Sequence, residues 1–270
     1  MDLIGQQHIL KALTSYNLLT IPKTVLLIGE EGSEQYLIAK KVAEFYNTDL
    51  IEITTDDLKL DSDALTEYKQ CPVSKFYYID LTSFFGHGNA TTKLLKLLEE
   101  PGEHMYIIAS IDSTAGIEEA ILNRCLKFTC APYTDEQLRE CEWMVRNPND
   151  LVYKVCRTPG QLADVDGDQV KALFVLCEKI INQIGKASYA NALTLVSKIN
   201  CDKNDEKFDF YQFFNALEYI SFTKYIETKN LEIYKLYMYI NKAKQSYLNK
   251  KVAKESFILN FLDGLWRVTH

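Results

Sequence analysis

The sequence predicts an α/β domain built on a parallel β-sheet, followed by a helical region. Three features of the 270 residues support this fold class. Short apolar runs alternate with helical patterns up to about residue 133, which is typical of a parallel sheet covered on both faces. A glycine-bounded loop directly follows the first apolar run. From about residue 134 the pattern is helical throughout.

Five short runs are predicted to form the sheet. Each is rich in aliphatic or aromatic residues and ends at a turn or a polar residue, as buried strands do. The predicted strands are 24–28, 49–53, 75–80, 105–110 and 126–129. Helices are predicted over 2–18, 37–45 and 91–100, the last of them stopped by Pro101-Gly102.

The carboxy-terminal part is predicted to be helical in two sections. Residues 135–165 have a short helical pattern interrupted at Thr158-Pro159-Gly160. Residues 168–200 place their apolar side chains on one helical stripe, a polar loop is expected at 202–207, and long helices follow. The predicted domains are therefore 1–133, 134–166 and 167–270.

Composition favours a cytoplasmic protein. No apolar run approaches the roughly 20 residues of a membrane-spanning helix, and the first residues lack the pattern of a signal peptide. Seven scattered cysteines without a CxxC pair argue against a disulfide framework or a zinc cluster, and favour a reducing compartment.

Charge is unevenly distributed along the chain. Residues 171–270 carry a net charge of +5 and the other residues −12, for a total of −7. An acidic module is not attracted to DNA by its overall field, so any contact with nucleic acid needs a local basic surface or a partner. A solvated surface without a partner is the alternative explanation.

The glycine-bounded loop lies where a phosphate-binding loop would lie, but its chemistry differs. In such a loop, backbone amides hold phosphate, a lysine reaches the outer phosphates and a Ser or Thr holds magnesium. Gly29 and Gly32 are present, whereas the second outer glycine is replaced by Glu34, the lysine by Gln35 and the hydroxyl residue by Tyr36. This pattern indicates a degenerate P-loop.

Acidic residues in the loop also argue against a bound nucleotide. Glu30, Glu31 and Glu34 would repel a triphosphate. The alternative is that the segment is a plain strand–turn–helix packing unit. We therefore expect no nucleotide, metal or other cofactor.

Asp80 ends the predicted strand 75–80, where P-loop ATPases place an acid that holds magnesium. Leu81 follows at the position where a catalytic glutamate would be expected. A lone Asp at a strand end is also a common cap, so Asp80 by itself is a weak signal.

Several segments, in this order, resemble clamp-loader subunits of bacterial DNA polymerase III, which belong to the AAA+ superfamily. The pattern LLKxLEEP followed by a motif similar to SRCxxF is the specific part, and it agrees best with the delta-prime type, a relative of the gamma/tau ATPase subunit. The similarity has motifs over 1–165 and only a general helical pattern over 170–270. The segments are Ile4-Gly5-Gln6, 29–36, Tyr78-Ile79-Asp80, 92–101, 107–110 and 121–128.

The resemblance implies an AAA+-like α/β domain, a small helical lid and an all-α collar that joins subunits into a ring. It implies a subunit that is not itself an enzyme. This subunit would assemble as a hetero-oligomer with a gamma/tau-type ATPase and a delta subunit, and would act on the sliding clamp and primer–template DNA through that complex, without a membrane. The alternatives are a gamma/tau-like ATP-binding subunit, or an AAA+-like adaptor of a helicase loader or repair complex.

The resemblance also singles out Arg124, within Asn123-Arg124-Cys125, where the serine of the motif is replaced. In such complexes this arginine projects into the ATP site of a neighbouring subunit. We therefore expect Arg124 to be an arginine finger that acts in trans. The alternative is that Arg124 caps the preceding helix or pairs with Glu118 or Glu119.

Two other departures from the family concern zinc and nucleotide sensing. Many relatives carry a four-cysteine zinc module, but the corresponding interval here holds only Cys71, so no zinc is expected. The stretch 158–163 is similar to a lid segment in which a sensing arginine occurs, and Gln161 does not provide one.

The carboxy-terminal helices carry candidate contact residues. Large aromatic residues are typical of interfaces, although packing within a helical bundle is the alternative. They are Tyr219, Tyr225, Tyr234, Tyr237, Tyr239, Tyr247 and Trp266. Lys250, Lys251 and Lys254 are candidate DNA contacts, with a solvated helix face as the alternative.

Overall fold

The computed structural model describes residues 3–57, 63–84, 88–114, 117, 119–163, 165–184, 210–249 and 254–269. The chain divides into two compact units. The first unit comprises residues 1–140 and 158–161, and the second comprises 141–157 and 162–270.

The first unit is built on a five-stranded parallel sheet in the order β2-β3-β4-β1-β5. All five predicted strands are confirmed, with β2 shorter than predicted and β4 one residue longer. The strands are β1 (Thr24–Ile28), β2 (Leu50–Glu52), β3 (Lys75–Asp80), β4 (Met105–Ile111) and β5 (Leu126–Thr129).

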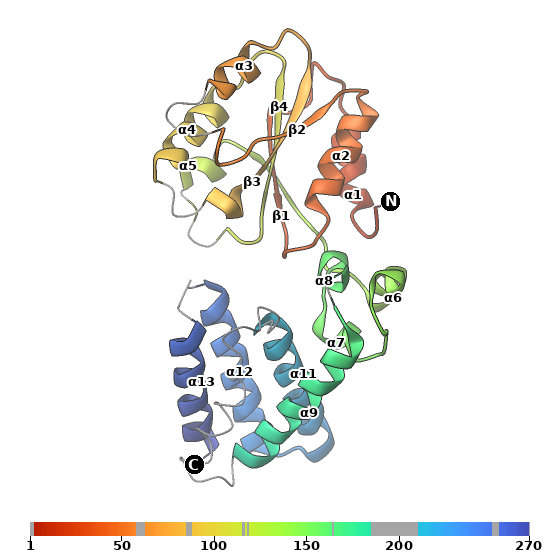
Figure 1. Cartoon of the computed structure of the whole chain (residues 1–270), viewed down its shortest axis with the longest axis vertical. Coiled ribbons are helices and arrows are strands. Elements are labelled where there is room, and N and C mark those ends of the chain that lie inside the picture. The colour runs from red at the N-terminus through yellow and green to blue at the C-terminus, as the bar shows by residue number, and fades with distance from the viewer. Residues whose placement is uncertain are drawn as a thin grey trace. The chain divides into compact units, whose positions relative to one another are not determined.

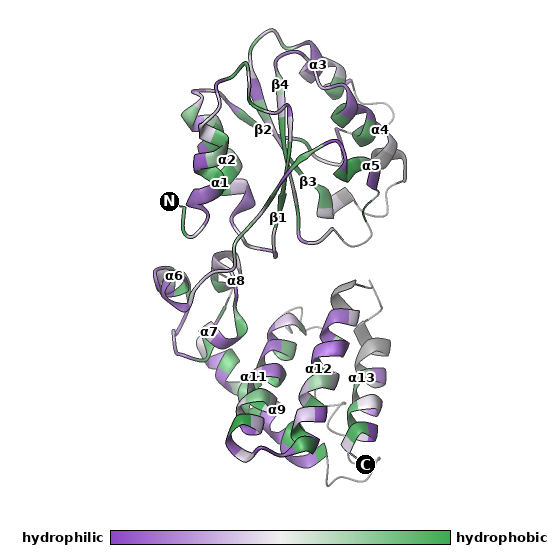
Figure 2. Ribbon diagram, turned by 180° about the vertical axis from the view of Figure 1, so that it is seen from behind, coloured by the Kyte–Doolittle hydropathy of each residue, from purple (hydrophilic) through white to green (hydrophobic). Residues whose placement is uncertain are grey.

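Burial along the strands follows their places in the sheet. β4 lies between β3 and β1 and is buried at every position, as expected for a central strand of a sheet covered on both faces. The edge strands β2 and β5 have no fully buried residue. The hydrophobic stretches of the strands and of the helices that cover them are green in Figure 2.

Helices cover both faces of the sheet, because parallel strands need crossover connections. Figure 1 shows α1 and α2 on one side and α3, α4 and α5 on the other. The predicted helix over 2–18 is shorter in the structure. α3 was not predicted; it is only seven residues long, and its apolar Leu65 and Tyr68 are only partly buried against the core. The helices are α1 (Gln7–Thr14), α2 (Gln35–Phe45), α3 (Ala64–Gln70), α4 (Gly88–Glu99) and α5 (Glu119–Leu122).

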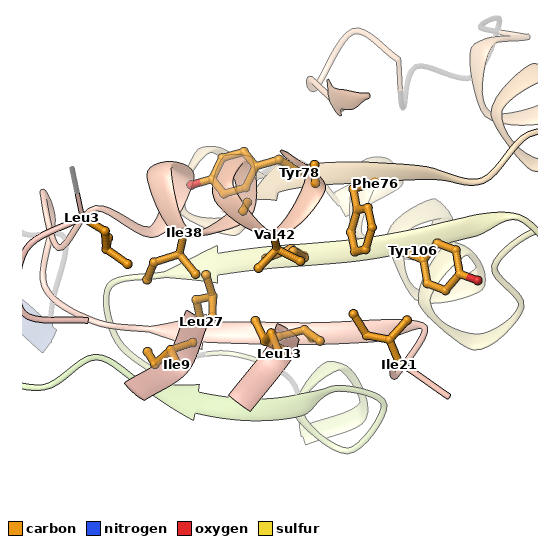
Figure 3. Packing of buried hydrophobic residues seen from close by; sticks show 14 of the residues in the cluster. Leu3, Ile9, Leu13, Ile21, Leu27, Ile38, Val42, Phe76, Tyr78 and Tyr106 are labelled. Atoms are coloured by element: carbon orange, nitrogen blue, oxygen red, sulfur yellow. The ribbon is translucent and has the colours of Figure 1, made fainter. Parts of the chain in front are cut away.

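Each face of the sheet has its own hydrophobic core. Figure 3 shows Leu13 of α1 and Val42 of α2 against Leu27 of β1 and the ring of Phe76 in β3. On the other face, the leucines of α4 pack against inward-facing residues of β3 and β4. The two cores together hold the sheet between its helices, so the ends of its strands are left to form sites.

The second unit is helical. In it α11 packs against α7, α9 and α12, and α13 packs against α12 and α9. Its helices are η2 (Glu142–Met144), α7 (Val152–Val155), α9 (Gly167–Ile184), α11 (Phe210–Thr228), α12 (Leu231–Asn249) and α13 (Lys254–Thr269). The predicted helix 168–200 agrees with α9 as far as Ile184, whereas 185–200 and the predicted loop 202–207 lie outside the described residues.

Three short helices remain in the described part of the chain: η1 (Leu81–Phe84), α6 (Asp135–Arg139) and α8 (Pro159–Ala163). The stretch expected to interrupt the helical pattern at residues 158–160 is the start of α8. Pro159 is its first residue, a position where the missing N–H has no helical partner in any case. The parallel sheet of this order, followed by helices, is an α/β, AAA+-like fold.

A helix must be both long and apolar to cross a lipid bilayer. Within the described ranges, no helix combines the length and the apolar character needed to span a membrane.

Candidate functional site

The glycine-bounded loop joins β1 to α2 at the carboxyl edge of the sheet, where open α/β sheets bind ligands. The N–H of Gly29 donates to the carbonyl oxygen of Ile111 at 3.0 Å, which ties the loop to the end of β4. Gly32 and Glu34 both have positive φ angles, 82° and 60°. The loop thus keeps a tight turn at the expected place.

Gln35 and Tyr36 occupy the lysine and hydroxyl positions, and both turn to partners within the protein. Gln35 is buried, and its side-chain Nε2 donates to the carbonyl oxygen of Gly29 at 2.8 Å. The half-exposed ring of Tyr36 lies edge-on to Tyr78, with 5.1 Å between the ring centres. Gln35 therefore closes the loop on itself.

The segment Thr158–Gln161 lies directly on this loop, within the first unit. The hydroxyl of Thr158, a buried residue, donates to the carbonyl oxygen of Glu31 at 2.7 Å. The N–H of Gly160 donates to the carbonyl oxygen of Gly32 at 3.0 Å. The two glycine backbones are so close that a Cβ on Gly32 would lie 2.8 Å from the Cα of Gly160. The loop is therefore covered by the chain's own backbone.

The amino-terminal segment Ile4-Gly5-Gln6 is attached to the same region. The Ile4 N–H donates to a carboxylate oxygen of Glu34 at 3.1 Å. The side chain of Gln6 is buried and makes two hydrogen bonds with the backbone of Ala131, of 2.8 and 2.9 Å. Burial raises the pKa of Glu34, and the bond from Ile4 opposes this. The segment thus connects the loop with the chain that follows β5.

Carboxylates gather at the ends of the strands beside the loop. Asp80, at the end of β3, accepts a hydrogen bond from the N–H of Thr82 at 3.0 Å, which is the capping role that the sequence left open. Burial of its carboxyl group, together with the charges of Glu31 and Asp80, raises the pKa of Asp112 to about 6. Asp112 was not singled out from the sequence, where the predicted strand ends at Ser110; it directly follows β4 because that strand extends to Ile111.

These acids do not form a metal centre. Among the residues that the structure describes, no three His, Cys, Asp or Glu side chains are arranged to hold a metal ion. A negatively charged edge of this kind opposes the approach of a phosphate group.

Arg124 lies between α5 and β5, at the amino-terminal ends of the strands, opposite the carboxyl ends that carry the loop. Its carbonyl oxygen accepts a hydrogen bond from the hydroxyl of Thr24 at 2.5 Å, and Thr24 is the first residue of β1. The loop follows Ile28, the last residue of the same strand. Since a strand rises about 3.3 Å per residue, the length of β1 separates Arg124 from the loop by roughly 13 Å or more.

The guanidinium group of Arg124 has two partners. Its Nη2 forms an ion pair with Glu99, the last residue of α4, and its Nη1 donates to the carbonyl oxygen of Ala120 in α5. Its Nε is buried and has no hydrogen-bond partner within the described part of the chain. The acid partner is therefore Glu99 rather than Glu119, and Glu118 lies outside the described residues.

A buried polar network in the second unit carried no signal in the sequence. Lys244 of α12 is only 3% exposed. Its Nζ donates to Asn215 at 2.6 Å and pairs with Glu218 at 2.7 Å, both in α11. Arg157 also pairs with Glu218 at 3.2 Å, and Asn215 donates to the carbonyl oxygen of Val155 at 2.6 Å. The network therefore joins the segment before α8 to α11 and α12.

The candidate collar aromatics contact one another or nearby rings within the bundle. The pairs are Tyr219 with Phe174, Tyr225 with Tyr234, Tyr234 and Phe222 with Tyr237, and Tyr239 with Phe261. Tyr219 and Tyr234 remain partly exposed, and Trp266 is partly buried in α13. Lys250, Lys251 and the side chains of Tyr247 and Lys254 lie outside the described residues.

The sheet order, together with the helices on both faces, defines an α/β protein with an AAA+-like fold. In sequence, the chain is similar to DNA polymerase III subunit gamma of Buchnera aphidicola, with 24% identity over 229 residues, 73% of this chain and 56% of the relative. It is also similar to DNA polymerase III subunit tau of Escherichia coli, with 28% identity over 233 residues, 75% of this chain and 36% of the relative. The chain thus spans about half the length of the Buchnera gamma subunit and about a third of the length of the Escherichia coli tau subunit. No family model matches.

Two of the solved structures with a similar course of the chain are from Thermotoga maritima. One is a DNA polymerase III gamma subunit-related protein, with a TM-score of 0.47 and 14% identity, covering 98% of this chain and all of that one. Another is RuvB, with a TM-score of 0.48 and 16% identity, covering 83% of this chain and 76% of that one. The sequence similarities support the gamma/tau-related clamp-loader family of DNA polymerase III, and they do not distinguish the delta-prime type.

Proposed function

We propose that the chain is a non-hydrolysing subunit of a sliding-clamp loader in DNA replication, of the delta-prime type. One observation carries the proposal: the loop after β1 is closed by Gln35 from within and covered by Thr158 and Gly160 from outside. A phosphate would have to displace this segment. The similarity to gamma and tau subunits supports the family.

The chemistry at the carboxyl edge supports the same proposal. ATP hydrolysis in this class needs a lysine on the outer phosphates, a hydroxyl group on magnesium and an orienting residue for water. Gln35, Tyr36 and Leu81 occupy these positions. Glu31, Asp80 and Asp112 add negative charge where the phosphates would lie. The chain would therefore not turn over ATP by itself.

The proposed contribution of this subunit to catalysis is Arg124, which would act on the ATP of a neighbouring subunit. Its place at the sheet edge opposite its own loop supports action in trans, because Arg124 cannot reach a ligand at the loop. A guanidinium group stabilises charge that develops on a transferring phosphoryl group, and such fingers accelerate GTP hydrolysis by about 10³–10⁵.

The proposed assembly is a cytoplasmic hetero-oligomer. Its ATP sites belong to gamma/tau-type subunits, and a delta subunit, the sliding clamp and primer–template DNA complete the complex. We also propose that residues 1–133, 134–166 and 167–270 correspond to the AAA+ domain, the lid and the collar of such a subunit.

Calorimetric titration of the isolated chain with MgATP tests the absence of a nucleotide site. We expect no saturable binding at millimolar nucleotide, with the gamma/tau-type subunit of the same organism as the positive control. Tight binding followed by hydrolysis would overturn the proposal in favour of a gamma/tau-like ATPase. Failure to co-purify with the clamp and the polymerase subunits would favour an adaptor outside replication.

The trans role is tested with Arg124→Ala in the complex reconstituted with its ATPase subunits. We expect single-turnover hydrolysis at the adjoining ATP site to fall about 10³-fold or more, while assembly measured by size-exclusion chromatography stays intact. Arg146→Ala, at an exposed arginine of the second unit, is the matched control. Unchanged turnover in the Arg124 variant would reject the role.

A further inference from the structure

We propose that Glu99 is a positioning residue, whose carboxylate holds the guanidinium of Arg124 in the orientation in which Arg124 meets an oxyanion of a neighbouring subunit. The inference rests on the proposed function, because it assigns a partner to the arginine that would act in trans. It is carried by the ion pair between the two side chains, which come from different motifs of the sequence.

The hydrogen-bond donors of Arg124 are only partly used. A guanidinium group has five N–H donors, one on Nε and two on each terminal nitrogen. Glu99 takes one from Nη2 and the carbonyl of Ala120 takes one from Nη1. Among the residues that the structure describes, Nε is buried without a partner, and the side chain as a whole is 30% exposed. With respect to those same residues, one N–H on each terminal nitrogen remains for an anion, which is the number that a bidentate contact with a phosphoryl group uses.

Both ends of the ion pair are attached to rigid parts of the fold. The carbonyl oxygen of Arg124 accepts a hydrogen bond from the hydroxyl of Thr24, and the Arg124 N–H donates to the carbonyl oxygen of Ile121. Glu99 ends α4, whose Leu97 and Leu98 are buried in the core. Side chains that bind or react need this kind of support, because a displacement of about 1 Å lowers rates by about 10²-fold.

Stability alone does not explain the pair. Glu99 is 43% exposed and Arg124 30% exposed, and pairs so close to solvent add little to stability. Removal of Glu99 should therefore change the rate of hydrolysis in the complex much more than the folding of the chain. Glu100, an exposed carboxylate one residue further along, has the same charge and provides the matched control.

The test uses five variants in the complex reconstituted with its gamma/tau-type ATPase subunits and MgATP. They are Glu99→Ala, Glu99→Gln, Glu100→Ala, Arg124→Ala and Glu99→Ala combined with Arg124→Ala. We expect Glu99→Ala to lower kcat at the adjoining site about tenfold to a hundredfold with KM for ATP unchanged. Glu99→Gln keeps an acceptor oxygen and should recover part of the rate. Glu100→Ala should match the wild type.

The double variant decides whether Glu99 acts through Arg124. We expect the double variant to be no slower than Arg124→Ala alone, with assembly and thermal unfolding unchanged in all five. A further loss in the double variant, a rate for Glu99→Ala equal to wild type, or a rate above it would each overturn the inference while the role of Arg124 stands. An unchanged rate for Arg124→Ala would instead overturn the proposed trans role and the inference with it.

Discussion

Gly160 donates its backbone N–H to the carbonyl oxygen of Gly32 at 3.0 Å, and no side chain separates the two residues. A Cβ on Gly160 would lie 2.4 Å from the Cα of Gly32, closer than two carbon atoms can approach. The glycine that a P-loop uses for the approach of a phosphate is used here for the approach of another segment of the chain.

Gly160→Ala is expected to destabilise the first unit. The added methyl group must move the backbone of Gly32, and such overpacking costs about 1–3 kcal/mol. Thermal unfolding followed by circular dichroism measures the loss. Glu30→Ala, at an exposed loop residue, is the control and should unfold like the wild type. Equal stability of Gly160→Ala and wild type would contradict the close contact.

Gln35→Lys combined with Tyr36→Thr is expected not to create an ATP site. Both substitutions restore the residue types of an active loop, but Thr158 and Gly160 still cover Glu31 and Gly32. Calorimetry with MgATP should show no saturable binding. The Kd should be weaker than about 1 mM, which means that binding releases less than about 4 kcal/mol of free energy. Micromolar binding by the double variant would mean that the side chains alone, and not the covering segment, exclude nucleotide.

Lys244→Met is expected to destabilise the second unit by about 2–3 kcal/mol. Removal of one partner of a buried ion pair costs about 3–5 kcal/mol. The loss of stability should be smaller here, because Glu218 still forms its ion pair with Arg157 when Lys244 is replaced. Urea unfolding measures the change. Lys242→Met, at an exposed position of the same helix, is the matched control and should lie within about 0.5 kcal/mol of the wild type. Similar losses in both variants would contradict the role of the network.

Asp112→Asn is expected to stabilise the first unit at neutral pH. The pKa of Asp112 in the folded chain, about 6, lies above its ordinary value of 3.8, so the folded state binds the proton more strongly. Asp112 therefore contributes most to the free energy of unfolding below about pH 4, and this contribution is lost as the pH rises to about 6 and above. Asparagine does not ionise, so the variant keeps its stability as the pH rises.

Melting temperatures between pH 4.5 and 8 measure the effect of Asp112→Asn. Because Asp112 is exposed, screening by solvent should limit the effect to about 1 kcal/mol, or about 2–4 °C in Tm at pH 7.5. Glu30→Gln removes a charge from the loop after β1 and is the control. A pH dependence of the Asp112 variant parallel to that of the wild type would show that the carboxyl group does not carry the effect.

The central strands were predictable because they are buried on both faces and therefore read as continuous apolar runs. Lys75–Asp80 agrees with the prediction at both ends, and so does the edge strand Leu126–Thr129, although none of its residues is fully buried. Ala64–Gln70 was missed because this seven-residue helix packs only Leu65 and Tyr68 against the core, too few residues for a periodic signal. The division into three domains stays a prediction.

At the candidate site, the sequence identified the positions but not the partners. Gln35, Tyr36 and Asp80 could be placed by their spacing from the strands. The contact of Thr158 with Glu31 joins residues 127 positions apart, and no local pattern reports such a contact. The alternative to the trans role of Arg124 named Glu118 or Glu119 as its acid partner, whereas the structure pairs it with Glu99, 25 positions away.

The sequence by itself determined the class of fold and the residue types at the loop, since both depend on local pattern and spacing. Only the tertiary structure decided what those residues contact: which segment covers Gly32, which acid holds Arg124, and which helices share Lys244. These are long-range contacts made by side chains of ordinary type, and they arise from the packing of elements that the chain brings together only when it folds.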